Sequence, residues 1–178
     1  VIPDKIVARP SNFSPRFCYS YFALYGDPLL EMETDPFPEG YLAQLAASGV
    51  DGVWLQGLLR KLAPFPWDMS LSEGYKKRLA NLKKLVSRAK RYGVRIYLYL
   101  NEPRSLPVDF FDKYADLRGI TQSVYMNDRS TLCTSHPEVQ RYLEDAVASI
   151  VREVPDLGGF FTITASENLT NCWSFYNK

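Results

Sequence analysis

Residues 155–167 read Pro-Asp-Leu-Gly-Gly-Phe-Phe-Thr-Ile-Thr-Ala-Ser-Glu, and this stretch decides the fold class. A helix-length segment precedes it, Gly158 and Gly159 predict a turn, and the apolar run Phe160–Thr164 predicts a short strand. A carboxylate, Glu167, follows that strand. In a parallel α/β barrel, side chains at the C-terminal ends of the strands point into the active site. Glu167 is therefore either a catalytic group or a surface acid at the end of a strand.

The rest of the chain alternates between predicted strands and predicted helices. Apolar runs rich in aromatic residues predict strands at Phe17–Leu24, Val50–Gln56 and Val94–Leu100. Apolar side chains spaced by three and four residues predict helices, which are residues 40–48, 75–89, 110–117 and 137–154. Residues 58–69 are predicted to form a loop over the mouth of a barrel, and residues 120–134 an irregular polar loop.

Polar residues mark the expected starts of two helices. Ser70 and Glu73 have the spacing of a capping box before the helix 75–89. Ser135 and Glu138 repeat that spacing, so Ser135 is the predicted N-cap of the last long helix. The only histidine, His136, is expected at the start of that helix rather than as a catalytic base.

Four strand and helix repeats with apolar strands predict a parallel sheet covered by helices. This α/β pattern suits a parallel (β/α)8 TIM barrel, which needs about 250 residues when complete. We therefore expect the chain to carry about the first four βα units. Residues 1–15 are expected to be an N-terminal extension, and residues 16–178 the N-terminal half of the barrel. A smaller open α/β domain is the alternative, although the sequence has no Gly-x-Gly-x-x-Gly or Walker-type phosphate loop.

The composition argues against several classes of protein. Of the 178 residues, 46% are hydrophobic and 23% are charged, with a formal net charge of +1. A charge this small provides no field to attract a nucleic acid or a membrane surface, and no apolar run reaches the roughly 18 residues of a membrane span. Three cysteines without a Cys-x-x-Cys pair and one histidine argue against a metal site and a Ser-His-Asp triad. We expect no metal and no cofactor.

Aromatic residues make up 14% of the chain. Tyr25, Trp54, Trp67 and Trp173 fall near the ends of predicted strands. Aromatic faces stack on the apolar faces of sugars, and Tyr and Trp add a polar group. Each of these side chains has an alternative role in packing the core or its rim.

Residues 154–167 resemble the strand-four region of the α-glucuronidase family of glycoside hydrolases. In that family a helix ends in Pro-Asp-(apolar)-Gly-Gly-Phe, and the next strand ends in Ser-Glu. Residues 49–56 are similar to the family's second strand, and residues 91–101 to its Tyr-Gly-Ile-(Lys/Arg)-Val-Tyr-Leu segment with a following Asn. The resemblance implies a TIM barrel with glycoside hydrolase activity. It also implies that Glu167 is the general acid, because the Glu of the family's Ser-Glu has that role.

The sequence departs from this family directly after Glu167. The family continues with Gly-Gln-Pro-Gly-Pro, whereas residues 168–173 read Asn-Leu-Thr-Asn-Cys-Trp. The fold and the acid are therefore expected to carry over, but not the specificity for glucuronic acid. The more distantly similar β-hexosaminidase-like barrels place Asp-Glu at this point. Ser166 stands in the Asp position here, so their substrate-assisted mechanism is not expected.

A second carboxylate stands in the tripeptide Asn101-Glu102-Pro103, after the predicted strand 94–100. The tripeptide resembles the acid/base signature of the large cellulase-like clan of barrels, where it ends strand four. Here it follows the third predicted strand. Three roles stay open for Glu102: an acid/base, a contact with the substrate, and a solvated turn carboxylate paired with Arg104. Of these we expect a contact with the substrate at the rim.

Other polar side chains are expected at the same rim as the acid. The predicted substrate-binding residues are Gln56, Asn101, Glu102, Asn168 and Trp173. The sequence thus predicts a glycoside hydrolase that acts on a plant or microbial glycan, with Glu167 as its acid. The second carboxylate and the remainder of the barrel would lie beyond Lys178, in the same polypeptide or in an associated chain.

Other functions stay open. A carbohydrate-binding barrel without catalysis would keep the aromatic and amide side chains, and a glycosidase of the cellulase-like clan would use Glu102 as its acid/base. A sugar-phosphate enzyme is disfavoured, because its phosphate site would follow strands seven and eight. A periplasmic or extracellular location is favoured over the cytoplasm.

Overall fold

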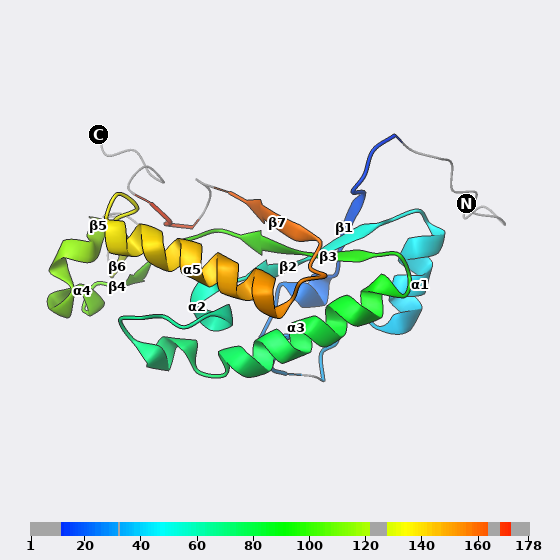
Figure 1. The fold of residues 1–178 in the computed structure, drawn as a ribbon, viewed down its shortest axis with the longest axis horizontal. Coiled ribbons are helices and arrows are strands. Elements are labelled where there is room, and N and C mark those ends of the chain that lie inside the picture. The colour runs from blue at the N-terminus through cyan, green and yellow to red at the C-terminus, as the bar shows by residue number, and fades with distance from the viewer. Residues whose placement is uncertain (1–11, 32, 122–127, 164–167, 172–178) are drawn as a thin grey trace. The chain divides into compact units, whose positions relative to one another are not determined.

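The computed structural model describes residues 12–31, 33–121, 128–163 and 168–171 (Figure 1). The chain consists of two compact units. The first comprises Val1–Gln56, Lys76–Tyr99 and Val151–Phe161, and the second Gly57–Tyr75, Leu100–Ile150 and Thr162–Lys178. Among the described residues, no helix combines the length and the apolar character needed to cross a membrane.

A four-stranded sheet forms the centre of the first unit. Its strands are β1 (Phe17–Tyr19), β2 (Gly52–Gly57), β3 (Arg95–Leu100) and β7 (Gly159–Thr162), in the order β1-β2-β3-β7 (Figure 1). Strands β1 and β2 are parallel. The N–H of Gly158 donates to the carbonyl of Ile96, and that of Ile163 to the carbonyl of Leu100, so β7 runs in the direction of β3. The predicted α/β class with four neighbouring strands is confirmed, and four strands are half of an eight-stranded barrel.

One face of this sheet packs against helices. The helices are α1 (Glu39–Ala47) and α3 (Tyr75–Lys90), close to the predicted ranges. Since side chains alternate along a strand, every second strand residue enters this layer. Its buried members include Val53, Leu55, Ile96 and Leu98 from the strands, and Leu42, Leu45, Leu82, Val86 and Ala89 from the helices. Arg91, just after α3, pairs with Glu39 at the start of α1, which joins the two helices.

The opposite face of the sheet is aromatic. Its rings contact one another with centroids 4.8 to 5.7 Å apart, and they are Phe17, Tyr19, Trp54, Tyr97, Tyr99 and Phe161. Phe17 is 46% exposed and Tyr19 is 48% exposed, although both are large and apolar. Both lie on β1, which is an edge strand of the sheet. Burying this face would require further strands or another apolar surface.

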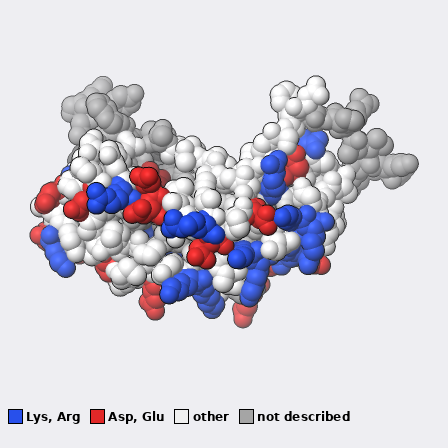
Figure 2. Space-filling view, viewed as in Figure 1, with Lys and Arg blue, Asp and Glu red and all other residues white. Residues whose placement is uncertain are grey.

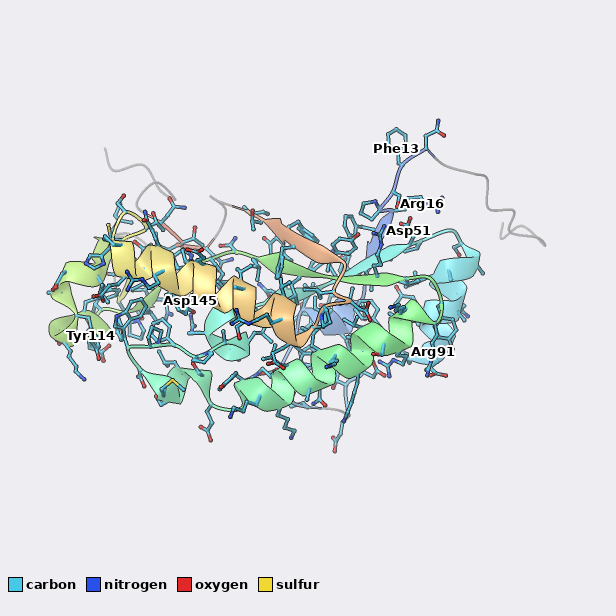
Figure 3. All side chains as sticks on the ribbon, viewed as in Figure 1. Phe13, Arg16, Asp51, Arg91, Tyr114 and Asp145 are labelled. Atoms are coloured by element: carbon cyan, nitrogen blue, oxygen red, sulfur yellow. The ribbon has the colours of Figure 1, made fainter. Side chains whose placement is uncertain are left out.

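Polar side chains tie the N-terminal ends of the strands together. The Asp51 carboxylate, just before β2, accepts hydrogen bonds from Ser14 Oγ at 2.6 Å and from the N–H of Arg16. Figure 3 shows Arg16 and Asp51 side by side. Arg95 of β3 also donates to Ser14 Oγ, at 3.4 Å. These bonds hold the start of β1 against β2 and β3.

Close packing explains the Gly158-Gly159 pair before β7. A Cβ at Gly158 would lie 2.8 Å from the Tyr97 ring, 2.9 Å from the Arg95 Cβ and 2.9 Å from the Ile96 carbonyl. The carbonyl belongs to the strand itself and cannot move aside cheaply. Gly159 has φ of +145°, which side-chain-bearing residues rarely adopt. Glycine is therefore needed where β7 approaches β3.

The second unit contains a small antiparallel sheet. Its strands have the order β4-β6-β5 and are β4 (Leu106–Pro107), β6 (Arg129–Leu132) and β5 (Arg118–Thr121). The helical elements of the unit are α2 (Leu59–Leu62), η2 (Met69–Ser72), α4 (Phe110–Lys113), η3 (Ala115–Leu117) and α5 (Pro137–Glu153), of which the last three residues count with the first unit. Phe65, Trp67 and Tyr142 form an aromatic cluster with centroids 5.1 to 5.4 Å apart.

The first predicted strand is too long. Strand β1 ends at Tyr19, and a 3-10 helix, η1 (Tyr21–Ala23), replaces its second half. The N–H of Ala23 donates to the carbonyl of Ser20 at 2.9 Å, which turns the chain away from the sheet. Aromatic content favoured a strand here, but the run Tyr21-Phe22-Ala23-Leu24-Tyr25 does not alternate between apolar and polar residues as a strand with one solvated face does.

Both predicted N-caps are wrong. Ser70 lies inside η2 and not at the start of α3, which begins at Tyr75, and Asp68 caps η2 by accepting from the N–H of Ser70 at 3.0 Å. The last helix starts at Pro137, and Nδ1 of His136 accepts from the N–H of Glu138 at 3.3 Å. His136 thus takes the position predicted for Ser135, and its own expected place at the start of this helix is confirmed.

Two predicted loops contain regular structure. The segment 120–134, expected to be irregular, carries the second half of β5 and all of β6, and the loop 58–69 contains α2. The predicted helix 110–117 is broken at Tyr114, whose backbone leaves the helical region at φ −130° and ψ 52°. The Tyr114 hydroxyl donates to the carbonyl of Trp67 at 2.8 Å. A local sequence pattern does not predict such a contact between distant segments.

We expect Gly158→Ala to lower the free energy of unfolding by about 1–3 kcal/mol, the usual cost of overpacking. Gly40→Ala is the matched control, because nothing lies within 4 Å of a Cβ there. That change in helix α1 should instead be neutral or stabilising by up to about 1 kcal/mol. Urea unfolding of the three proteins measures both effects, and equal stability of the Gly158 variant and the parent would contradict the packing argument.

Candidate functional site

The predicted acid, Glu167, and the predicted aromatic contact, Trp173, lie outside the described residues. Strand β7 ends at Thr162, and Ile163 is hydrogen-bonded to Leu100, the last residue of β3. Ile163 therefore lies beside the end of β3, where Asn101 and Glu102 follow.

The Glu102 carboxylate joins two segments of the second unit. Its Oε1 accepts a hydrogen bond from the N–H of Leu59 at 2.8 Å, and its Oε2 accepts from the N–H of Arg104 at 2.6 Å. Leu59 is the first residue of α2, so the acid fixes the start of that helix to the turn after β3. Both oxygens are thus held by main-chain donors.

Two kinds of effect act in opposite directions on the pKa of Glu102. Burial raises the pKa of the Glu102 carboxyl above its usual range, and this is the largest effect. The two N–H donors and the positive guanidinium groups of Arg104 and Arg60 act against it. Burial likewise lowers the pKa of Arg60 and raises that of Tyr142, so all three groups share a poorly solvated environment.

Arg104 connects this carboxylate to the segment after β7. Its Nε donates to the carbonyl of Asn101 at 3.3 Å, and its Nη1 donates to Oδ1 of Asn168 at 2.7 Å. Nearby, Arg129 donates to the carbonyl of Ser105 at 2.6 Å and to its Oγ at 3.1 Å. The side chain of the residue directly after Glu167 in the chain is therefore anchored to the turn that carries Glu102.

Asn101 is the unusual member of this cluster. Its exposed fraction is 0%, and neither Nδ2 nor Oδ1 has a hydrogen-bond partner among the described residues. A buried amide without partners costs free energy, so such groups are rare in folded proteins and usually meet water, a ligand or another polar group. The amide is therefore available for a polar contact at the end of β3.

The structure brings together three of the five predicted substrate-binding residues. Asn101, Glu102 and Asn168 belong to one cluster in the second unit, held by Arg104. Gln56 belongs to the first unit, where it is exposed near the end of β2. The alternative role of Glu102 as a solvated carboxylate paired with Arg104 does not fit the structure, because the carboxylate binds the N–H of Arg104 while the guanidinium reaches Asn101 and Asn168.

Sequence reasoning missed the surrounding residues of the cluster. These are Arg60, Ser105 and Tyr142. They come from α2, the turn after β3 and α5, and no spacing in the sequence connects them. In the part of the chain that the structure describes, no group of three or more His, Cys, Asp or Glu side chains has the arrangement of a metal site.

Charges of both signs are interspersed on the face of the molecule that Figure 2 shows. No extended patch of one sign covers that face. Ion pairs on α3 contribute to this mixture, such as Arg88 with Asp35 at 2.7 Å and Lys90 with Asp156 at 2.8 Å.

No family model and no curated protein matches the chain. Among solved structures, the chain is similar to the crystal structure of a noncanonic maltogenic alpha-amylase, AmyB, from Thermotoga neapolitana. The sequence identity is 18% and the TM-score is 0.51. The similarity covers 85% of this chain but only 38% of the amylase chain. At this identity the likeness shows the fold alone: an α/β arrangement that is also found in part of an amylase.

We expect Glu102→Gln to lower the free energy of unfolding by about 1–3 kcal/mol, because the new amide would place an N–H group against a main-chain N–H donor. Glu144→Gln on the exposed side of α5 is the control, since it removes the same charge without breaking these bonds. Urea unfolding at acidic pH measures the difference. Equal losses in the two variants would show that the Glu102 bonds do not matter.

The same pair of variants should show a pH dependence. Burial raises the Glu102 pKa in the folded chain above the unfolded value, so ionisation costs the folded state more. The Glu102 contribution is therefore complete below the unfolded pKa of about 4.3 and declines as the pH rises through the folded pKa. The stability difference between the parent and Glu102→Gln should narrow from about pH 4 to pH 7. A difference that widens over that range would contradict the raised pKa.

Proposed function

We propose that the protein is part of a glycoside hydrolase that acts on a plant or microbial glycan. The observation that carries the proposal is the polar cluster at the end of β3, in which Asn101, Glu102 and Asn168 surround Arg104. Active sites of parallel α/β barrels lie at the C-terminal ends of the strands. The fold likeness to part of an amylase supports the same reading.

Glu167 is the proposed general acid. It directly precedes Asn168, whose side chain is fixed by Arg104, and it follows the last residue of β7, the neighbour of β3. A carboxylic acid there would protonate the leaving glycosidic oxygen. The neighbour's name, a maltogenic alpha-amylase, gives no support to glucuronic acid as the sugar, so we propose a glycan without naming its sugar.

Glu102 is proposed as a positioning residue. Both of its oxygens accept main-chain hydrogen bonds, which fixes the carboxylate and turns it away from the role of a free proton donor. The alternative acid/base role from the cellulase-like clan is favoured by the raised pKa alone. A carbohydrate-binding barrel without catalysis is the second candidate, and it is supported by the aromatic face of the sheet.

The remainder of the barrel is the proposed partner of the sheet, supplied by the same polypeptide or by an associated chain. The aromatic face with its half-exposed Phe17 and Tyr19 supports this proposal. So does the coverage of only 38% of the amylase chain. Carbohydrate is the proposed substrate, and no nucleic acid, membrane or cofactor is part of the proposal.

In the enzyme with its complete barrel, we expect Glu167→Gln to slow hydrolysis of glycosides with poor leaving groups by roughly 100- to 10,000-fold, because the proton donor is lost. Substrates with good leaving groups need less protonation and should be affected less. Steady-state kinetics with aryl glycosides of graded leaving-group pKa measure the effect. Glu102→Gln should change both series to a similar extent. The opposite pattern, with leaving-group dependence only in the Glu102 variant, would assign the acid to Glu102.

The 178-residue chain by itself should associate, because Phe17 and Tyr19 on the aromatic face of its sheet are about half exposed. Light scattering after size exclusion should detect species larger than a monomer, and replacing Phe17 and Tyr19 together by Ser should shift the chain toward the monomer. A parent chain that is monomeric at all concentrations would contradict a missing barrel partner.

A further inference from the structure

An uncharged aromatic segment follows β1 in the first unit. Tyr21 is 63% exposed, Phe22 58% and Tyr25 55%. Three large aromatic side chains within five residues are thus mostly in water, although burying them would be favourable. Exposed apolar patches of this kind mark places where a ligand or a partner binds.

The segment is held firmly although its rings face outward. Ser20 is 7% exposed and Ala23 is 3% exposed, so both face the protein. The Asp27 carboxylate forms an ion pair with Arg78 of α3 at 2.8 Å, and both side chains are largely buried. These anchors on both sides fix the backbone, which leaves the outward aromatic rings pre-organised rather than collapsed onto the surface.

Tyr21 and Tyr25 form a pair within the segment. The Tyr25 hydroxyl donates to the Tyr21 hydroxyl at 2.7 Å, and the ring centroids lie 4.7 Å apart with the planes tilted by 43°. The pair presents two ring faces next to two joined hydroxyl groups. The remaining lone pairs and the second hydroxyl proton stay available to a ligand.

The chemistry of this surface matches a neutral sugar ring. Residues 17–26 contain no charged side chain, so they offer no ion pair to an anionic or cationic group. A pyranose has an apolar face of C–H groups that stacks on an aromatic ring, and hydroxyl groups at its edge that accept and donate hydrogen bonds. The segment also follows the C-terminal end of β1, and such ends carry the ligand-binding loops of parallel α/β folds.

We propose that Tyr21 and Tyr25 form a subsite that binds one neutral pyranose unit of a glycan by stacking. The proposal rests on the proposed glycoside hydrolase function and names the class of sugar that this part of the surface accepts. Phe22, between the two tyrosines, extends the apolar surface. Uronic acids and sulfated sugars are not ligands of this subsite.

The test uses the 178-residue chain and isothermal titration with maltohexaose, cellohexaose, xylohexaose and chitohexaose, together with an oligogalacturonate as the anionic contrast. Tyr21→Ala and Tyr25→Ala should each weaken binding of a neutral hexasaccharide by roughly three- to tenfold, the effect of one aromatic stacking contact. Tyr21→Phe and Tyr25→Phe keep the ring and should retain most of the affinity. Phe13→Ala is the matched control, since Phe13 is 80% exposed and precedes β1.

Thermal unfolding should show that the variants are folded, because both rings are more than half exposed. Affinities of both alanine variants equal to that of the parent would overturn the subsite, and so would binding of the oligogalacturonate alone or of none of the sugars. Loss of self-association in the alanine variants without any change in sugar affinity would assign the rings to a protein interface instead. Retained hydrolysis in Glu167→Gln would overturn the proposed acid but leave the subsite intact.

Discussion

A single carboxylate, Glu102, fixes the geometry at the end of β3. It binds the N–H of Leu59 and that of Arg104, so two segments far apart in the chain depend on one side chain. The guanidinium of Arg104 in turn donates hydrogen bonds to the carbonyl of Asn101 and to the side chain of Asn168. Removing a buried acceptor leaves donors unsatisfied, which costs more than the net gain of an ordinary hydrogen bond. The cluster is therefore cooperative, and its parts are expected to be lost together.

The first unit is organised by apolar contacts on both faces of its sheet. The helix side follows the usual rule, with strand residues such as Val53 and Ile96 fully buried. The other side carries contacting rings, and Gly52 and Gly158 leave room for two of them, Phe17 and Tyr97. Glycine at these places lowers the propensity to form a strand, yet it allows rings to lie against the backbone. The aromatic face thus has specific packing among its own rings, while Phe17 remains 46% exposed.

Local patterns in the sequence predicted the helices and strands whose structure depends on burying one apolar face. Apolar runs located β2, β3 and β7, and helical spacing located α1, α3 and α5, because burial of one face determines each of them. Failures occurred where distant segments decide the local structure. Tyr114, inside the predicted helix 110–117, donates to the carbonyl of Trp67, and β5 exists because β6 pairs with it. The cluster at the end of β3 was predicted in part, since Asn101 and Glu102 stand in a motif, whereas Arg60 and Arg129 do not.

Asn101 is a residue that stability alone would not favour at its position. An apolar residue at position 101 could be buried there without leaving polar atoms unpaired. Asparagine there leaves a buried amide with no partner among the described residues. Violations of this kind are expected where function requires a polar group. Asn101 directly precedes Glu102 in the chain, and its main-chain carbonyl accepts the hydrogen bond from Arg104. Burial of Glu102 shows that this place is poorly solvated, and a hydrogen bond there is stronger than in water. A polar group that reached the amide would satisfy it, so the free energy lost in folding would be recovered.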